Sequence, residues 1–286
     1  MKTSEDQGKV QDYGFTSKSP VQSEIKKIDF HAHIFPDKIA DKAASAIGDF
    51  YNIPMHFADG SAGALLKTGT ESGISQFVVH SAASLPKHVI SINNFIAEKI
   101  KQHKEFIGFG ALHKDMEDPE SEIKRIIDLG LKGIKIHPDT QRFNADDKKM
   151  FQIYNHMQMY NLPLLIHAGD YRYDYSHPRR IRNIIDNFPD LPVVAAHFGG
   201  WSLWDLAIEF LRDTNCYLDT CSSSKFLGQV RTKGLIRIYG AERIIFGTDF
   251  PMWDAKEELE FLYNLKLSDE EMHFIFHKNA ERILGI

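Results

Sequence analysis

The sequence is short of cysteine and of long apolar runs, and its charges are nearly balanced. Only two cysteines occur in 286 residues, which excludes the disulfide framework of a small secreted domain. The longest apolar runs, such as LPVVAAHFGGW, are too short to cross a bilayer. A net charge of -5 gives no electrostatic reason to expect binding to nucleic acid or to anionic lipid. We therefore expect neither a nucleic-acid partner nor a membrane.

The first 24 residues lack the apolar segment and the small-residue cleavage pattern of a secretory leader. Their polar composition predicts a flexible tail over residues 1–24. Residues 25–286 contain no low-complexity run or linker, so we expect one domain there. Together these features predict a cytoplasmic protein.

Short apolar, β-branched segments alternate with longer segments of helical periodicity along the chain. The first kind predicts eight strands, at 26–33, 74–81, 106–112, 131–137, 162–168, 191–197, 216–220 and 243–249. The second predicts helices at 37–50, 88–103, 119–130, 145–161, 177–188, 202–213, 224–240, 255–266 and 268–286. Eight βα units are the number that closes a (β/α)8 barrel, so the predicted fold class is α/β with this architecture.

Two histidines lie two positions apart in the first predicted strand, IDFHAHIF. In a strand, His31 and His33 point to the same side, about 6 to 7 Å apart along the chain, and can chelate a cation. Taken alone, the pair is equally typical of a strand end with solvated or buried histidines. Asp29 lies two residues before His31, so its side chain points to the same side of the strand. We expect it either to orient a metal ligand or to be a buried polar residue one layer below.

Histidine or aspartate also ends most of the later strands. His137, His167 and His197 follow one another at intervals of 30 residues, and Asp219 and Asp249 are separated by the same interval. This interval is about one βα unit, so the side chains arrive at the same rim of the barrel, where active sites of this fold lie. Burying so many imidazoles and carboxylates together favours a bound cation, because unpaired buried charges are costly.

The segments DFHAH, GIKIHP, LIHAG, AHFGG and FGTDFP, in this order and spacing, resemble the amidohydrolase superfamily. The resemblance extends from about Ile25 to the C-terminus. It points to the amidohydrolase-related branch, which includes the aminocarboxymuconate-semialdehyde decarboxylase-like enzymes. It implies a distorted (β/α)8 barrel with one divalent ion, usually Zn²⁺, although manganese or iron suit the same donors. The implied metal ligands are His31, His33, His167 and Asp249.

The resemblance also implies catalytic roles for His197, as a base or electrostatic aid beside a metal-bound water, and for Asp249, as a proton shuttle. A cation of this kind lowers the pKa of bound water toward about 7, which gives a hydroxide nucleophile. The predicted activity is therefore hydrolysis of an acyl bond in a small substrate. The alternatives are non-oxidative decarboxylation on the same scaffold and, third, a barrel in which the ion is only structural.

Lys135 shares a face with His137, and the binuclear members of the superfamily carry a carboxylated lysine on this strand. We favour one metal ion, with His137 in the pocket wall. The loops after the strands supply further candidates for binding a small carboxylated or cyclic substrate: Arg142, Tyr171, Arg172, Trp201 and Trp253. The arginines are equally typical of a helix terminus or a subunit contact, and a homodimer is common among such relatives.

Overall fold

The computed structural model describes residues 25–286, and the predicted tail at 1–24 lies outside the described residues. Eight strands form one parallel sheet in chain order. Each lies within a segment predicted from the sequence: β1 (Ile28–His33), β2 (Gln76–His80), β3 (Phe106–Ala111), β4 (Gly133–Ile136), β5 (Leu164–Ile166), β6 (Val193–Ala195), β7 (Tyr217–Asp219) and β8 (Ile244–Ile245).

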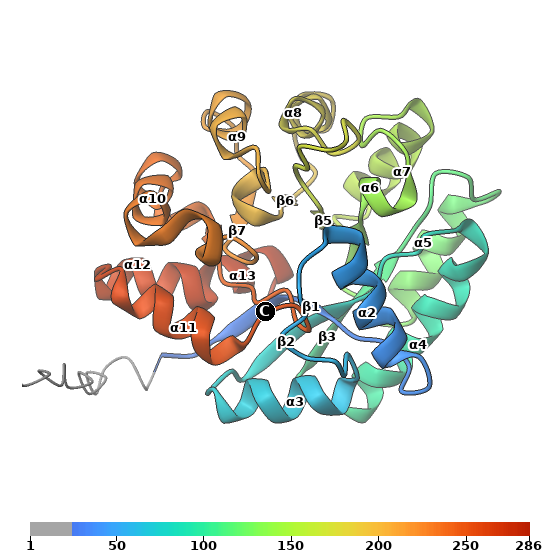
Figure 1. Cartoon of the computed structure of the whole chain (residues 1–286). Coiled ribbons are helices and arrows are strands. Elements are labelled where there is room, and N and C mark those ends of the chain that lie inside the picture. The colour runs from blue at the N-terminus through green and yellow to red at the C-terminus, as the bar shows by residue number, and fades with distance from the viewer. Residues whose placement is uncertain (1–24) are drawn as a thin grey trace, which may run out of the picture.

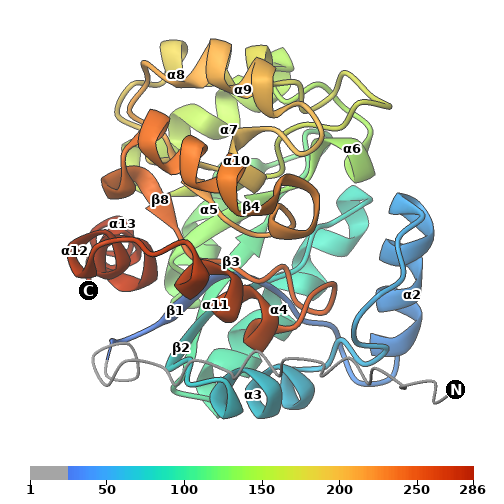
Figure 2. The ribbon, with the colours of Figure 1, turned by 60° about the vertical axis from the view of Figure 1, so that its left-hand side comes forward.

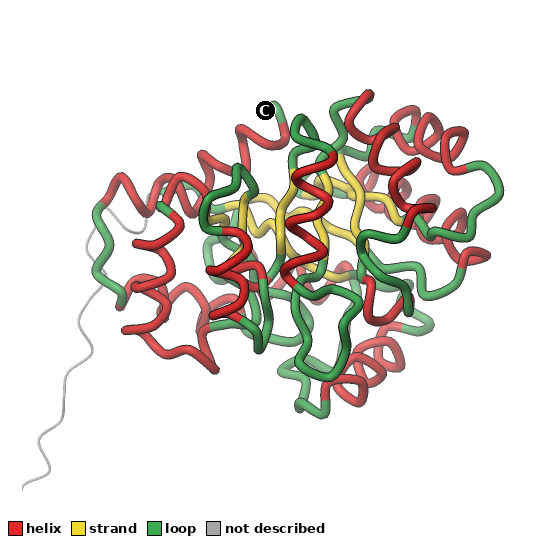
Figure 3. The backbone as a smooth tube through the Cα atoms, turned by 90° about the horizontal axis from the view of Figure 1, so that it is seen from above, coloured by secondary structure: helices red, strands yellow, loops and turns green. Residues whose placement is uncertain are grey.

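Backbone hydrogen bonds join the last strand region to the first. Phe30 N donates to Phe246 O at 2.9 Å, and Asp249 N donates to His31 O at 2.8 Å. Figure 3 shows the strands together at the centre with helices around them. The predicted (β/α)8 barrel is confirmed, and its closure brings the segment after β8 against β1.

The helices surround the strands, as Figures 1 and 2 show. They are α2 (Ala40–Tyr51), α3 (Ala62–Glu71), α4 (Val89–Gln102), α5 (Pro119–Asp128), α6 (Pro138–Gln141), α7 (Lys148–Met159), α8 (Pro178–Asn187), α9 (Trp204–Leu211), α10 (Ser224–Tyr239), α11 (Ala255–Asn264), α12 (Asp269–His273) and α13 (Asn279–Leu284), with a π-helical segment at Phe274–Lys278. No helix in this part of the chain has the length and apolar character to cross a membrane.

Helix α2 differs in position from the others. Figure 1 places it in front of the strands, and Figure 2 shows it at the edge of the molecule, away from the ring of outer helices. The helix that covers β2 from outside is instead α3, which the sequence analysis did not predict. The apolar pattern of α3 is interrupted by glycines. One of them, Gly69, is required by packing, because a Cβ there would lie 2.3 Å from the Phe77 ring. This extra helix leaves α2 free to lie over the end of the barrel.

The inward-facing side chains change in character along the barrel. Within the strands they form an apolar cluster that includes Phe30, Phe109 and Leu165, with the Phe30 and Phe109 rings 5.6 Å apart. At the carboxyl ends they are histidines and aspartates. The apolar cluster therefore closes the barrel below a polar rim, which is the arrangement expected for an active site in this fold.

Candidate active site at the carboxyl ends of the strands

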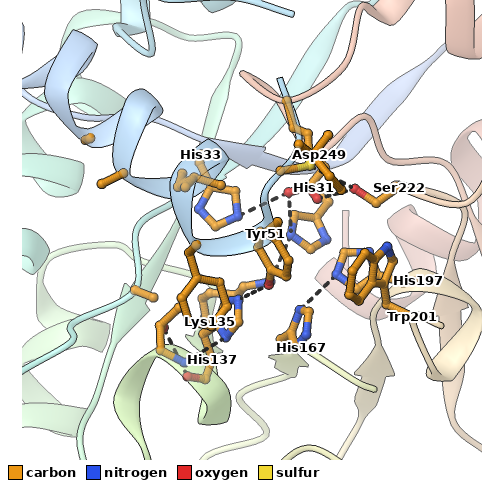
Figure 4. A pocket seen from close by; sticks show the side chains of 18 of the residues that line it. His31, His33, Tyr51, Lys135, His137, His167, His197, Trp201, Ser222 and Asp249 are labelled. Carbon is orange, nitrogen blue, oxygen red and sulfur yellow. Dashed lines mark hydrogen bonds and ion pairs between the residues drawn. The ribbon is translucent and has the colours of Figure 1, made fainter. Parts of the chain in front are cut away.

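A cavity of about 300 Å³ opens at this rim. We call its polar side the floor, formed at or just beyond the strand ends by His31, His33, Lys135, His137, His167, His197 and Asp249. We call its apolar side the roof, formed by α2 and the segment after it through Ala43, Ala46, Ile47, Phe50, Tyr51 and Ile53. Figure 4 shows the floor side chains converging on one space from different strands. The residues predicted as ligands and catalytic groups therefore line one cavity, in which the donor atoms of His167 lie close to those of His137 and Asp139.

The carboxylate of Asp249 lies beside both histidines of β1. Its Oδ1 is 3.4 Å from His31 Nε2 and 3.3 Å from His33 Nε2. Two donors bound tetrahedrally to one cation at about 2.1 Å lie about 3.4 Å apart, so these atoms have the spacing of ligands to a shared ion. Imidazole nitrogen and carboxylate oxygen suit zinc and other first-row divalent ions.

Hydrogen bonds behind these side chains set their orientation. Asp219, which is fully buried, accepts from His31 Nδ1 at 2.7 Å, and this bond leaves Nε2 of His31 available to a cation. Ser222 Oγ donates to Asp249 Oδ2 and accepts from Trp253 Nε1 at 2.7 Å. Trp253 does not line the cavity and instead contacts Asp249 through Ser222.

The charges of the floor favour a cation. Burial opposes ionisation of Asp219, but the adjacent His31 imidazole outweighs it and lowers the pKa of Asp219 to about 2. The pKa of Asp249 is likewise well below its usual value, since His31 and His33 outweigh burial. Burial lowers the pKa of His31 to about 4 and also lowers the pKa of His33. At neutral pH the carboxylates of Asp249 and Asp219 are therefore anions beside the neutral imidazoles of His31 and His33.

His167 and His197 lie on the other side of the floor. His167 Nε2 donates to Gly169 O at 2.9 Å, which leaves Nδ1 without a proton, and this nitrogen is 3.0 Å from His197 Nε2. The His137 ring stacks on His167, with centroids 4.0 Å apart. His197 has a left-handed backbone, with a φ of 60°, and its NH donates to Asp219. His197 is therefore within reach both of a predicted ligand and of the cavity.

Lys135 is the only lysine or arginine among the described residues that line the cavity. Its side chain is buried, and Nζ donates to His31 Nε2 at 2.9 Å. This nitrogen of His31 is the one that faces Asp249, so a cation there requires the ammonium of Lys135 to turn away or lose its proton. Burial lowers the pKa of Lys135, which makes loss of the proton easier.

The predicted substrate residues divide into two groups. His137 and Trp201 line the cavity, whereas Arg142, Tyr171 and Arg172 do not. Arg172 Nη2 is 2.6 Å from Asp170 Oδ2, and the guanidinium lies over the rings of Phe50 and Tyr51 on α2. The arginine-rich loop after β5 thus supports the roof from outside, and the side chain of Tyr171 is exposed.

Asp29 does not contact a ligand side chain. Its Oδ1 accepts from the backbone NH of His31 at 3.1 Å and of Thr248 at 3.0 Å, and its Oδ2 accepts from Thr248 Oγ1 at 2.6 Å. The register between β1 and β2 shifts between Asp29 and Ala32, so the strict alternation used in the sequence analysis does not hold there. Asp29 instead ties the backbone of β1 to the segment after β8.

The roof was missed by sequence reasoning, although its helix was predicted. Tyr51 is its one polar group, and the phenol is 2.8 Å from His137 Nε2. The Tyr51 ring also contacts Trp201, with centroids 5.2 Å apart. An amphipathic helix carries no signal for which face of a barrel it covers, so only the unusual position of α2 reveals these residues.

Comparison with known proteins agrees with the fold and with the motifs. A family model described as amidohydrolase matches residues 28–286. A γ-resorcylate decarboxylase from Polaromonas sp. (strain JS666) is 26% identical over an alignment of 250 residues, which covers 68% of this chain and 75% of that enzyme.

Solved structures share the barrel at lower sequence identity. The 5-carboxyvanillate decarboxylase of Sphingomonas paucimobilis superposes with a TM-score of 0.71 at 17% identity, covering 92% of this chain and 100% of that one. A dihydroxybenzoic acid decarboxylase from Polaromonas sp. JS666, with bound manganese and the inhibitor 2-nitroresorcinol, gives a TM-score of 0.69 at 17% identity. That match covers 91% of this chain and 97% of the other. At these identities the superpositions establish the fold alone.

Proposed function

The chain belongs to the amidohydrolase family, and from this membership we propose that it is a metal-dependent decarboxylase of a small aromatic carboxylic acid. The observation that carries the proposal is the 26% identity to a γ-resorcylate decarboxylase over 250 residues. Hydrolysis was the first expectation from the sequence and decarboxylation the second. The similarity supports the reverse order, since hydrolysis is implied only by the superfamily.

The cavity is consistent with such a substrate. Its volume of about 300 Å³ is at the small end for ligand sites, which suits a single ring. The apolar roof can pack on the faces of the ring, while the floor receives its polar substituents. A divalent cation on His31, His33, His167 and Asp249 would supply Lewis-acid stabilisation to carboxylate or hydroxyl oxygens of the substrate. Zinc and manganese both fit these donors, and manganese is the ion in one structurally similar enzyme.

The reaction needs one proton delivered to carbon. The bond between the ring and the carboxylate breaks, carbon dioxide leaves, and the electron pair returns to the ring carbon, which takes up the proton. We assign this transfer to His197, which lines the cavity beside His167, and to Asp249, which is also a proposed ligand. Tyr51 and His137 can hold a ring substituent through their shared hydrogen bond.

The test is to incubate the manganese- and zinc-loaded protein with hydroxylated benzoic acids and measure carbon dioxide and the decarboxylated ring. The expected result is equimolar release, with one deuterium at the former carboxyl carbon when the reaction runs in D₂O. A parallel panel of esters, lactones and amides tests acyl hydrolysis. Hydrolysis without carbon dioxide release from any acid would refute the decarboxylase and restore the first expectation.

A further inference from the structure

His80, at the end of β2, has an unusual environment for a buried polar residue. It is 0% exposed, and neither Nδ1 nor Nε2 has a hydrogen-bond partner. Among the described residues it is the one histidine for which both ring nitrogens are unsatisfied in this way. Buried polar groups are almost always paired, so two unpaired nitrogens on one ring need an explanation.

The neighbours of His80 are the two histidines of β1. Its ring centroid is 4.5 Å from that of His33 and 5.0 Å from that of His31, and its plane is steeply inclined to both. One ring nitrogen from each of the three histidines lies within 4.8 Å of the others. Donors that share one cation tetrahedrally at about 2.1 Å lie about 3.4 Å apart, so a shared ion requires these nitrogens to approach one another by up to about 1.4 Å.

Other partners for His80 are disfavoured by its position. It does not line the cavity, so a substrate in the cavity does not reach it. A neutral imidazole has one nitrogen lone pair that can accept a hydrogen bond or bind a cation. Neither His31 nor His33 forms a hydrogen bond with His80, so the lone pair of His80 has no partner there, whereas a cation would use it.

We infer that His80 is a further ligand of the divalent ion, giving the site a fourth imidazole donor from β2 in addition to His31, His33 and His167. This inference rests on the metal site of the proposed function. It predicts a coordination number of at least five protein donors, which suits manganese or a five-coordinate zinc better than a closed tetrahedron. The set differs from the one implied by the sequence motifs, which omits β2.

The first experiment uses the unaltered protein loaded with Co²⁺. Proton NMR should show four hyperfine-shifted imidazole NH signals, and three signals would overturn the inference. This measurement needs no variant, so a folding defect cannot obscure it. If the protein binds no Co²⁺, Mn²⁺ or Zn²⁺ at all, both the inference and the proposed function fail, whereas three signals from a bound ion overturn only the inference.

The second experiment measures Mn²⁺ and Zn²⁺ affinity by calorimetry for His80→Asn and His80→Phe. Loss of one ligand should weaken affinity at least about tenfold and change the visible spectrum of the Co²⁺ form. His113→Phe is the matched control, because His113 is also a buried histidine after a strand but does not line the cavity and accepts from Asp115 N. Affinities and spectra for His80→Asn that equal those of the control would overturn the inference.

Discussion

The floor of the cavity is formed by side chains at strand ends and in the turns after them, whereas its roof is formed by helix α2 and the segment directly after it. Two floor residues, His197 and Asp249, have left-handed backbones, with φ of 60° and 59°. Non-glycine residues adopt this conformation at a cost of about 1 kcal/mol or more, and such strain gathers at functional sites. The helical residues of the roof show no such strain.

The contacts that hold the floor and the roof in place also differ. Asp219 and Ser222, which hold the floor, are buried and act on its side chains directly. The roof is attached to the rest of the protein by contacts at the end of α2, where Arg172 Nη1 donates to Phe50 O and Tyr51 reaches His137. We conclude that the floor fixes the positions of its polar side chains, whereas the roof provides an apolar surface that fits the substrate. Substitutions in the floor and in the roof should therefore affect different kinetic constants.

The largest effect is expected from removing a ligand in the floor. Asp249→Ala should lose the ion and lower kcat by at least about 1000-fold, because both Lewis-acid stabilisation and a proton-transfer group are lost. Elemental analysis and carbon dioxide release measure the two effects. His137→Ala is the control, since His137 shares the floor but is not assigned as a ligand, and it should keep the ion. Loss of metal in His137→Ala with retention in Asp249→Ala would contradict the ligand assignment.

A smaller effect is expected one layer behind the ligands. Asp219→Asn keeps the size of the side chain but removes the charge that accepts from His31 Nδ1. Carboxylates behind metal-ligating histidines contribute about 10- to 100-fold in metal affinity or activity. We expect a loss in this range, measured by calorimetry with Mn²⁺. Unchanged affinity would show that the position of His31 does not depend on Asp219.

The floor could be predicted from the sequence and the roof could not, for a physical reason. Strand ends repeat with the βα unit, so His137, His167 and His197 reveal their common rim by their spacing of 30 residues. The sequence contains no comparable periodic signal for the side chains of α2. The same amphipathic pattern fits a helix on the outside of the barrel and a helix over its end. Arg172 was predicted to bind substrate from its place after β5, yet its guanidinium is held by Asp170, which lies two residues earlier.

The strand register and the hydrogen-bond partners within the floor could not be predicted from the sequence either. The alternation that places His31 and His33 together fails two residues earlier, where the register shift separates Asp29 from the pattern. His80 lies at the end of β2, but its lack of hydrogen-bond partners depends on three-dimensional packing and has no signal in the sequence. Periodicity therefore locates the rim, while hydrogen-bond partners depend on contacts between residues far apart in the chain.

The roof should control substrate binding rather than the chemical step. Ile47→Ala removes apolar surface from the cavity wall, and we expect KM for the best aromatic acid to rise about three- to tenfold with kcat nearly unchanged. Ile39→Ala is the matched control, because Ile39 precedes α2, is 49% exposed and does not line the cavity. A fall in kcat without a change in KM for Ile47→Ala would mean that the roof takes part in the chemistry.

The smallest effect on catalysis is expected at a buried carboxyl away from the floor. Glu258 on α11 accepts from Ser224 Oγ at 2.6 Å, and burial raises its pKa to about 7, in contrast to Asp249, whose imidazole neighbours keep it ionised. Because the folded-state pKa is raised above the unfolded value, this group favours the folded state at pH below about 4.5, and the contribution is lost as the pH rises through 7. The Glu258→Gln variant should lack this pH dependence. Its free energy of unfolding should exceed that of the unaltered protein by about 2 kcal/mol at pH 8 and by less at pH 5. Urea unfolding at the two pH values measures this, and equal differences would show that Glu258 stays ionised when buried, as Asp249 does.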